Sequence, residues 1–496
     1  MTEQMNIKAL MQTSGVKFGT SGARGLVVDM TDKVCYAYTL AFLQYLTEHG
    51  DIQLGDQVAV AGDLRPSSPR MMAAVGAAIS DAGFVPLSCG FVSTPAVALY
   101  AMKRNMACMM VTGSHIPDDR NGIKFYKPTG EILKGDEQGM TAKTVSLPAN
   151  RFAEDGALLV AFAWADKTDV AYHEYVKRFL DFFPSNMLAG QRIGIYEHSS
   201  VARDCMLEVV QKLGAEAISL GRSDTFIPVD TEAVRPEDVV LAKQWASELN
   251  LDCIISADGD GDRPLVSDEF GAWLRGDVAG IVCAKYLHAK AVVTPVSSNS
   301  ALEATNYFEK TTRTRIGSPF VIEAMHADVF SGINAVVGYE ANGGFLSATP
   351  LVKNAKTLSA LPTRDALIVP LTVLGTAIAA KQSISALLKT LPQRFTASDR
   401  VQNFAAEKSE ARLADLKQAN AQANIFAANH LLQAMFGDVT DVDITDGVRV
   451  TFASSEIVHL RPSGNAPELR CYVEAASESR VQAMLLQGMG LLESWK

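Results

Sequence analysis

Short apolar runs and amphipathic stretches alternate over the first 150 residues. The run 58–62 (VAVAG) predicts a buried strand, and residues 66–83 predict a helix that ends at Gly83. Residues 106–111 (MACMMV) predict another strand, which runs directly into a polar loop containing Ser114. We interpret the weakly patterned residues 142–165 as a connection to the next folded part.

The same pattern returns twice further along the chain. Residues 192–199 and 252–257 read as strands on either side of a helix at 201–214, and residues 279–344 continue in the same style. Three strands therefore deliver polar or glycine-rich loops, at Ser114, Asp258 and Glu340. Open α/β sheets bind ligands beyond the carboxyl ends of their strands, so we expect a site there.

The last hundred residues have a different period. Residues 441–452, 456–463 and 468–475 alternate as antiparallel strands do, and a helix is expected from about Ser477. The predicted fold is α/β, with three related mixed-sheet α/β domains and a smaller C-terminal α+β domain. The expected boundaries are 1–165, 166–275, 276–386 and 387–496.

Composition narrows the classes of function. The chain has 496 residues, of which 48% are hydrophobic and 20% charged, so several folded domains are expected rather than disorder. A net charge of -10 argues against a nucleic-acid partner. The N-terminus has no signal-like apolar core, and we interpret residues 366–381 as a buried helix, so no membrane association is expected. The seven cysteines include no CxxC pairs, which suits reduced thiols and a cytoplasmic location and argues against a zinc site.

The segment DGDGDR places three carboxylates, Asp258, Asp260 and Asp262, at alternate positions. Carboxylates this close repel one another unless a cation lies between them, and oxygen ligands favour Mg²⁺ or Ca²⁺. An EF-hand would need glycine where Arg263 stands and a helix where a strand is expected. A solvated acidic turn is the alternative, and we favour the metal site.

Two later loops suit a sugar phosphate. Glu340 and Asn342 in GYEANGG combine an acceptor and an amide, as paired sugar hydroxyls require, although such turns are common. In RPSGNAPELR, a guanidinium, a hydroxyl and backbone amides suit a phosphate; the residues are Arg461, Ser463, Gly464 and Asn465. No GxxxxGK[ST] loop is present, so ATP is not the implied phosphate source. Arg24 in KFGTSGARG is a further candidate anion ligand, or a surface arginine.

Ser114 lies outside any GxSxG elbow, and adjacent His115 is badly placed to act as its base, so a serine hydrolase is poorly supported. A turn or N-cap serine is the alternative for an isolated TGS. A serine that carries a phosphate, with a metal to neutralise it, would use the acidic, sugar and phosphate loops together.

With these residues in place, the chain resembles the α-D-phosphohexomutases. The segments KFGTSGARG, TGSHIPDDRNGIKFY, DGDGDR, GYEANGG and RPSGNAPELR follow the family's order and span residues 17–470. The resemblance implies a four-domain fold around a central cleft and a phosphorylated Ser114. It also implies one Mg²⁺ per chain, held by Ser114, Asp258, Asp260 and Asp262, and a hexose 1,6-bisphosphate as intermediate and activator.

The resemblance also implies roles for individual residues. Arg263 would steady the transferring phosphoryl group, and Lys124 and His115 would handle protons of the sugar hydroxyl. Arg24, the candidate anion ligand, is counted with them as a catalytic residue. Glu340 and Asn342 would bind sugar hydroxyls. The loop from Arg461 to Asn465, with Ser463 and Gly464, would bind the phosphate that is not reacting. Arg315 and Arg470 are further candidate substrate-binding residues.

Departures from the family pattern leave the preferred sugar open. His115-Ile116-Pro117 stands where His-Asn-Pro is frequent, Asn465 and Ala466 replace Thr and Glu, and Arg315 replaces a frequent lysine. We expect a phosphomannomutase, with phosphoglucomutase and then phosphoglucosamine mutase as alternatives; a Mg²⁺-dependent phosphatase or an inactive binding relative is more remote. The expected partners are small sugar phosphates, and the protein is expected to be a monomer or homodimer.

Overall fold

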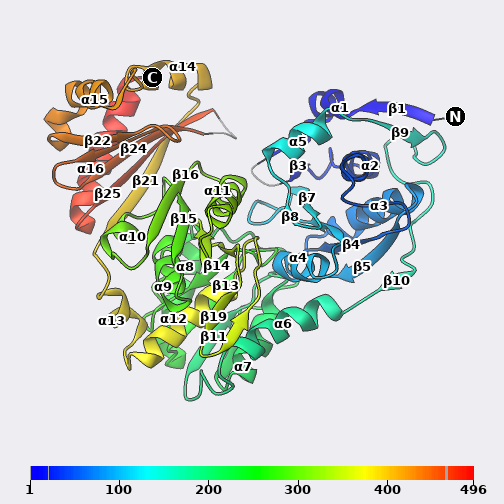
Figure 1. The fold of residues 1–496 in the computed structure, drawn as a ribbon, viewed down its shortest axis with the longest axis horizontal. Helices are drawn as coiled ribbons and strands as arrows, with labels where there is room; N and C mark the ends of the chain where they lie inside the picture. Colours follow the sequence, from blue (N-terminus) through cyan, green and yellow to red (C-terminus); the bar gives the residue numbers. More distant parts are fainter. Residues whose placement is uncertain (1, 20–21, 464–466) are drawn as a thin grey trace. The chain divides into compact units, whose positions relative to one another are not determined.

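The computed structural model describes residues 2–19, 22–463 and 467–496, and the chain divides into two compact units. Unit 1 comprises Met1–Val292 and Gly317–Leu387, and unit 2 comprises Val293–Ile316 and Leu388–Lys496. Figure 1 shows the elements of both.

The N-terminal part of unit 1 is built around one mixed sheet. Its strands are β1 (Thr2–Asn6), β2 (Lys17–Phe18), β3 (Ala23–Leu26), β4 (Gln57–Gly62), β5 (Val85–Gly90), β6 (Ala107–Val111), β7 (Arg120–Lys127), β8 (Gly130–Glu131), β9 (Thr144–Pro148) and β10 (Asp166–Lys167). Its helices are α1 (Ile7–Ser14), α2 (Asp32–His49), α3 (Ser68–Asp81), α4 (Thr94–Met102) and α5 (Lys134–Thr141). The sheet order is β10-β5-β4-β6-β7-β3-β2, with β8 beside β7, while β1 and β9 form a separate antiparallel pair.

The apolar runs form strands here because both faces of the sheet are covered. Val60 on β4 and Met109 on β6 belong to the core that includes α2 and α3. The intervening residues Ala59 and Cys108 are also buried, and α4 packs against β4 and β6. Strand β4 is parallel to β5 and β6, and β6 is antiparallel to β7, so the sheet is mixed.

The middle part of unit 1 has a four-stranded sheet of order β12-β11-β13-β14. Its elements are α6 (Val170–Phe182), β11 (Arg192–Tyr196), α7 (Arg203–Lys212), β12 (Glu216–Leu220), α8 (Pro236–Leu249), β13 (Cys253–Ala257), β14 (Pro264–Val266) and α9 (Gly276–Tyr286). Strand β11 is parallel to β12 and β13, whereas β13 and β14 are antiparallel and enclose residues 258–263. The acidic loop is therefore the tip of a hairpin.

The rest of unit 1 supplies a second hairpin. Its elements are α11 (Ser318–Phe330), β17 (Val336–Tyr339), β18 (Phe345–Ser347), β19 (Leu351–Lys353), β20 (Lys356–Leu358), α12 (Ile368–Ala379) and α13 (Ile384–Leu388). Strands β17 and β18 are antiparallel and enclose residues 340–344. Helix α12 is buried along most of its length, as expected from residues 366–381.

Unit 2 has an antiparallel sheet of order β21-β25-β24-β23-β22. Its elements are α10 (Ala301–Ala304), β16 (Lys310–Thr314), β21 (Phe395–Gln402), α14 (Ala406–Ala414), α15 (Ala421–Phe436), β22 (Val439–Asp443), β23 (Val448–Phe452), β24 (Ile457–Pro462), β25 (Glu468–Ala475) and α16 (Glu478–Ser494); β15 (Ala291–Pro295) begins in unit 1. Ser477 caps α16, as the sequence predicted. Inward positions of the strands pack with α14, α15 and α16 in one core.

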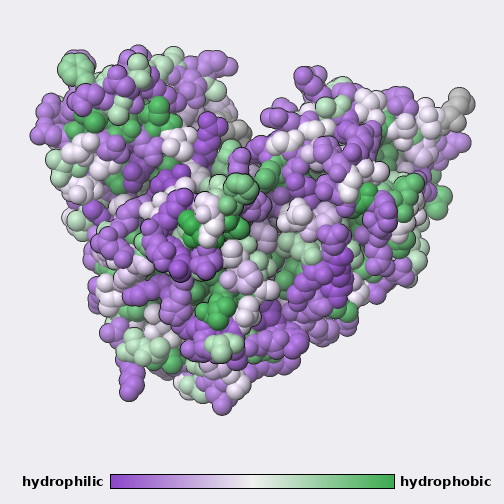
Figure 2. Space-filling view, viewed as in Figure 1, coloured by the Kyte–Doolittle hydropathy of each residue, from purple (hydrophilic) through white to green (hydrophobic). Residues whose placement is uncertain are grey.

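The mixed α/β fold predicted from the sequence is confirmed. The segment 142–165 is more structured than expected, because it contains β9, and its Phe162 and Trp164 pack on the core. All seven cysteines are buried free thiols. Among the described residues, no helix is long and apolar enough to cross a membrane. The face in Figure 2 is largely hydrophilic, with hydrophobic residues interspersed.

Candidate active site

Ser114 lies just beyond the carboxyl end of β6, in the loop that leads to β7. The residue is fully buried and has a φ of 57°, in the left-handed region that residues other than glycine rarely adopt. Its backbone N–H donates to Thr112 Oγ1 at 2.7 Å, and its Oγ donates to Asp258 Oδ2 at 2.6 Å. The serine and the acidic loop, far apart in the sequence, therefore meet in unit 1.

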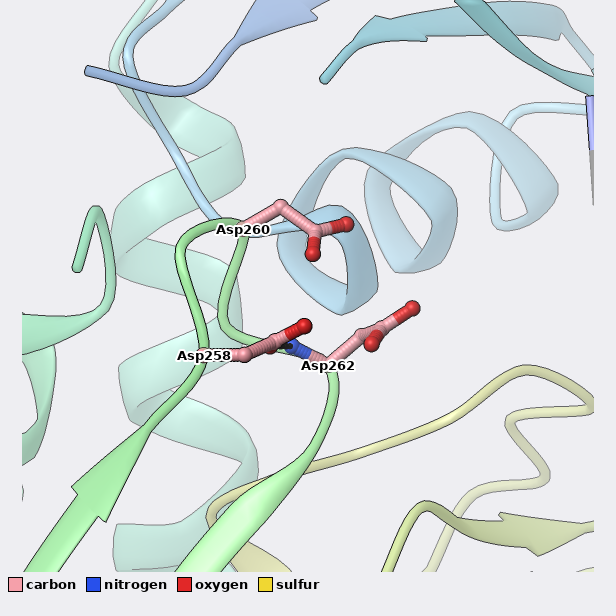
Figure 3. Close-up of side chains that lie close together, drawn as sticks. All are labelled: Asp258, Asp260 and Asp262. Carbon is pink, nitrogen blue, oxygen red and sulfur yellow. Dashed lines mark hydrogen bonds between the residues drawn. The ribbon is translucent and has the colours of Figure 1, made fainter. Parts of the chain in front are cut away.

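The three aspartates lie on the hairpin tip between β13 and β14, and Figure 3 shows their carboxylates projecting toward one space. Each is fully buried, and one oxygen from each lies within 4.8 Å of the others. Gly261, with a φ of 70°, allows the tight turn between Asp260 and Asp262. The backbone N–H groups of Asp262 and Arg263 both donate to Asp258 Oδ1 at 3.1 Å, which fixes that carboxylate.

Cations and a helix end offset the carboxylate charge. Lys124 on β7 is buried, and its Nζ donates to Asp260 Oδ2 at 2.6 Å and to Asp262 Oδ2 at 2.5 Å. Arg364 Nε donates to Asp262 Oδ2 at 3.0 Å. Thr94 begins α4; its backbone N–H donates to the backbone carbonyl of Asp260, and its hydroxyl donates to the Asp260 carboxylate. The positive end of the α4 dipole thus lies beside Asp260.

The pKa values of two aspartates move in opposite directions. Burial, together with the charges of Asp260 and Asp262, raises the pKa of Asp258 well above its ordinary value. Burial also acts to raise the pKa of Asp262, but Arg364, Lys124 and Arg263 outweigh it and lower that pKa below the usual range. The cations therefore stabilise negative charge at Asp262 more than at Asp258.

A small divalent cation fits this donor set. The ligand atoms are carboxylate oxygens, which Mg²⁺ prefers. Asp260 Oδ1 and Asp262 Oδ1 are buried and, among the described residues, have no hydrogen-bond partner. Buried carboxylate oxygens without partners are costly, so a ligand for them is expected. The candidate metal residues predicted from the sequence, Ser114 and the three aspartates, are thus brought together.

His115 is held as a neutral imidazole beside the serine. Burial, with the charges of Arg263 and Arg24, lowers its pKa far below the ordinary value. Arg263 Nη1 donates to His115 Nδ1 at 2.9 Å, so the ring proton resides on Nε2. Ser114 Oγ lies 3.4 Å from the same Nδ1, whose lone pair Arg263 already occupies. His115 is therefore not arranged as a general base for Ser114.

Arg24 and the β17–β18 loop complete the charged surroundings in unit 1. Arg24 lies on β3, and burial together with Arg263 and Arg364 lowers its pKa to about 10, so it stays protonated at neutral pH. Glu340 is buried and accepts from Arg364 Nη1 at 3.1 Å. Asn342 caps its own turn by accepting from Gly344 N–H, and its carbonyl accepts from Thr231 Oγ1 at 2.6 Å.

The remaining predicted residues lie in unit 2. Arg461 on β24 donates through Nε to Asp446 Oδ1 at 2.9 Å, and Arg315 donates through Nε to the Thr445 carbonyl at 3.3 Å. Both guanidinium groups therefore lie at the turn between β22 and β23. Arg470 on β25 pairs in register with Arg461, and the Ser463 N–H donates to Glu468 O at 2.8 Å. Gly464 and Asn465 lie outside the described residues.

Three contributors were missed by sequence reasoning: Arg364, Thr94 and Asp446. Arg364 is 1% exposed and links Asp262 to Glu340, but a single arginine in PTRDAL carries no distinctive spacing. Thr94 precedes a proline at the start of an apolar stretch, a recognisable helix start that was not connected with the acidic loop. Asp446 lies in the turn between β22 and β23, which divides the single strand expected over residues 441–452, so the sequence reading placed it inside a strand.

Comparison with known proteins agrees with this arrangement. Residues 15–146 match phosphoglucomutase/phosphomannomutase alpha/beta/alpha domain I, residues 275–395 match domain III, and residues 403–487 match the C-terminal domain. The chain belongs to the phosphoglucomutase/phosphomannomutase family of the α-D-phosphohexomutase superfamily.

Individual relatives cover nearly the whole chain. A phosphomannomutase from Sinorhizobium fredii is 42% identical over 480 residues, which are 97% of this chain and 99% of the relative. A phosphomannomutase from Salmonella muenchen is 43% identical, with 95% of each chain covered. The fold is similar to the crystal structure of a phosphoglucomutase/phosphomannomutase family protein from Burkholderia thailandensis, with a TM-score of 0.72, 19% identity, and coverage of 96% and 97%.

Proposed function

We propose that the protein is a phosphomannomutase that interconverts mannose 6-phosphate and mannose 1-phosphate through a phosphoserine at Ser114 and a hexose 1,6-bisphosphate. The observation that carries the proposal is the hydrogen bond from Ser114 Oγ to Asp258 at 2.6 Å, inside a buried cluster of carboxylates and cations. The 42% identity to a phosphomannomutase over nearly the full chain supports the choice of sugar.

In the forward half-reaction, the bond from phosphorus to Ser114 Oγ breaks and a bond forms to the C1 hydroxyl oxygen of mannose 6-phosphate. The pair predicted for proton handling, Lys124 and His115, would take up the C1 hydroxyl proton and return it to the C6 oxygen in the second half-reaction. For His115 this requires release of the Arg263 hydrogen bond that occupies its Nδ1 lone pair. In the second half-reaction, Ser114 Oγ takes the phosphoryl group from C6 of the bisphosphate, so the product is mannose 1-phosphate. Phosphoryl transfer depends on positioning and charge neutralisation, and fixed cations here include Lys124, Arg263 and Arg24.

The acidic loop would hold one Mg²⁺. When bound by Asp258, Asp260, Asp262 and phosphorylated Ser114, this ion would neutralise charge on the phosphoryl oxygens. Lys124 and Arg364 orient the carboxylates through their hydrogen bonds to Asp260 and Asp262. The buried position of Ser114 keeps bulk water from the phosphoserine, which limits its hydrolysis.

Binding of the sugar and of its second phosphate is assigned to two further groups. Glu340 and Asn342 bind sugar hydroxyls. The phosphate that does not react binds to a set of arginines and polar residues in the C-terminal half of the chain, namely Arg315, Arg461, Ser463, Gly464, Asn465 and Arg470. Because the bisphosphate presents each phosphate in turn, the same set serves both half-reactions. The four domains assigned to these tasks are 1–165, 166–275, 276–386 and 387–496.

The test compares purified wild-type protein with the Ser114→Ala variant. Rates with mannose 1-phosphate, glucose 1-phosphate and glucosamine 1-phosphate are measured side by side, with Mg²⁺ and a hexose 1,6-bisphosphate. We expect mannose 1-phosphate to give the highest kcat/KM, and a phosphate adduct on Ser114 by peptide mass spectrometry. The Ser114→Ala variant should lose at least about a factor of 1,000 in kcat, because the covalent route is removed. A variant with full activity would overturn the proposal.

A further inference from the structure

Arg65 lies beneath the serine loop and is bonded to it along the loop's whole length. The residue follows β4 in the chain and is 1% exposed. A guanidinium has five N–H donors, and all five are used here. Their acceptors are Asp63 Oδ2 (Nε, 3.1 Å), the carbonyls of Pro117 (2.6 Å) and Arg120 (2.9 Å) for Nη1, and the carbonyls of Ser114 (2.9 Å) and Ile116 (2.6 Å) for Nη2.

The arginine is itself held in place. Its Asp63 partner also accepts from Thr112 Oγ1 at 2.7 Å and from Ser68 Oγ at 2.5 Å, so this carboxylate has a fixed orientation. The ring of Phe226 stacks on the guanidinium, with the Arg65 Cζ atom 4.0 Å from the ring centroid. The hydrogen bonds therefore fix the guanidinium within its own plane, and the Phe226 ring limits its movement out of that plane. The loop carbonyls bind to a donor that does not move.

The glycine before the serine is explained by this packing. A Cβ on Gly113 would lie 2.6 Å from Arg65 Cζ and 2.8 Å from Nε, closer than carbon and nitrogen atoms approach. Gly113 thus lets the guanidinium lie flat against the backbone. On the other side of the loop, a Cβ on Gly259 would lie 2.7 Å from the Ser114 carbonyl oxygen. The Ser114 peptide is confined between the arginine and the acidic hairpin.

This confinement bears on the serine's backbone. Ser114 has a φ of 57°, and such a conformation in a residue with a side chain persists only where its surroundings hold it. Arg65 binds the Ser114 carbonyl, and Thr112 binds the Ser114 N–H. With both sides of the residue held, the Oγ atom is directed at Asp258.

We propose that Arg65 is a positioning residue for the nucleophile, with Gly113 as its required neighbour. Arg65 touches no reacting atom; it holds the backbone that presents Ser114 Oγ to the acidic loop. The consequence for catalysis rests on the proposed function, since it assumes that Ser114 carries the transferred phosphate. Loss of this support should lower the rate of phosphoryl transfer far more than the binding of the sugar phosphate.

The test uses Arg65→Lys and Gly113→Ala, with Arg178→Lys as the matched control. Lysine keeps the charge of Arg65 but cannot bond to four carbonyls and a carboxylate at once. Arg178 is also a buried arginine, bonded to the Ser359 carbonyl and near Asp365, but it makes no contact with the serine loop. All three variants should lose thermal stability. Only the first two should lose about a factor of 100 in kcat per folded molecule, with KM within about a factor of three of wild type.

Two further measurements separate positioning from folding. Guanidinium chloride at millimolar concentration should restore part of the kcat of Arg65→Ala, whereas ammonium chloride at the same concentration should not, because only guanidinium matches the vacated site. Hydrogen exchange of residues 113–120 should be faster in Arg65→Lys than in Arg178→Lys, a readout that needs no activity.

The outcomes distinguish this inference from the proposed function. Wild-type protein without mutase activity and without phosphate on Ser114 would contradict the proposed function, and the exchange experiment would still decide whether Arg65 fixes the loop. If the wild-type protein is active, either of two results would overturn the positioning role. One is a wild-type kcat for Arg65→Lys, measured below the melting temperature of that variant. The other is a hydrogen-exchange rate of residues 113–120 in Arg65→Lys equal to that in Arg178→Lys.

Discussion

The charged residues of the proposed reaction centre in unit 1 and those of the proposed phosphate-binding set in unit 2 are held in contrasting ways. In unit 1, Asp258, Asp260 and Lys124 are buried and bonded to one another or to fixed backbone groups. In unit 2, Arg461 and Arg470 are half-buried, and each has a carboxylate partner on its own sheet or an adjoining turn. Buried charges are oriented by the fold, whereas half-buried ones remain partly solvated.

The contrast indicates a division of labour. Electrostatic groups act most strongly on a reacting phosphoryl group when they are preorganised and shielded from water. A group that must bind two different phosphates of the same bisphosphate in turn does not need that rigidity. Substitutions in unit 1 should therefore act on the chemical step, and substitutions in unit 2 should act on the capture of the substrate.

The largest effect is expected for Asp260→Asn in unit 1. The change removes a metal ligand and a charge, and it leaves Lys124 and the α4 terminus facing a neutral amide, so kcat should fall by about 100-fold or more. Chelation of wild-type protein with EDTA should abolish activity, and Mg²⁺ should restore it. Mg²⁺ should also raise the melting temperature of the wild type but not of the variant.

Exposed Asp224→Asn serves as the control in the same part of the chain, and should stay within about a factor of two of wild type. If the wild type keeps full activity in EDTA, or if Asp260→Asn and Asp224→Asn have equal effects, the acidic hairpin does not take part in catalysis.

A smaller effect is expected for Arg461→Ala in unit 2. Loss of one charge-assisted phosphate contact, worth about 1.5–3 kcal/mol, should lower kcat/KM by about 10- to 100-fold. The loss should be equal for mannose 6-phosphate and mannose 1-phosphate, because the proposal assigns both phosphates to one set. Arg400→Ala, on β21, which β25 separates from β24, should change neither rate by more than about twofold. A loss confined to one direction would show that the set binds one phosphate position only.

The smallest expected effect is on the pH dependence of the folding stability of unit 2. His459 on β24 is buried and bonded to the Asp446 carbonyl at 2.6 Å, and burial lowers its pKa to about 4. In the unfolded chain its pKa is about 6.5, so between these values the unfolded state binds a proton that the folded state does not. Stability is therefore lost as pH falls through this window, by about 2 kcal/mol between pH 7 and pH 5.

His459→Gln should remove this contribution to acid sensitivity. Native-state hydrogen exchange in β24 and β25, corrected for intrinsic rates, measures it directly. If the variant loses as much stability as the wild type between pH 7 and pH 5, His459 is not the responsible group.

The sequence revealed strands where apolar residues are continuous, because β4, β6 and β13 are buried on both faces and need no polar alternation. It did not reveal β9, whose short alternating sequence TVSLP pairs with β1 in a separate two-stranded sheet. Very short strands such as β2 and β8 depend on their neighbours in the sheet, and their two residues carry no periodic signal.

Site residues divide along a similar line. Asp258, Asp260 and Asp262 were predictable because a single turn brings neighbours in sequence together. Arg65 and Arg364 were not predictable, because their partners are carbonyls and carboxylates from distant segments. In the sequence, a single arginine that is buried in the fold cannot be told from a surface arginine. The part of Lys124 in the site came from resemblance to the family; its pairing with two aspartates is set by the register of β7 beside β6.

The separation of Ser114 from Asp258 along the chain has a consequence for the order in which the protein matures. The two residues are 144 positions apart, whereas Arg65 is 49 positions from the serine it supports. During synthesis, Arg65 emerges from the ribosome before the serine, so its guanidinium is available to the serine loop as soon as the loop is made. Its acidic partners follow only after the intervening residues have been translated. Under the proposed function, Ser114 would therefore receive its phosphate only after the hairpin that carries Asp258 has folded beside it.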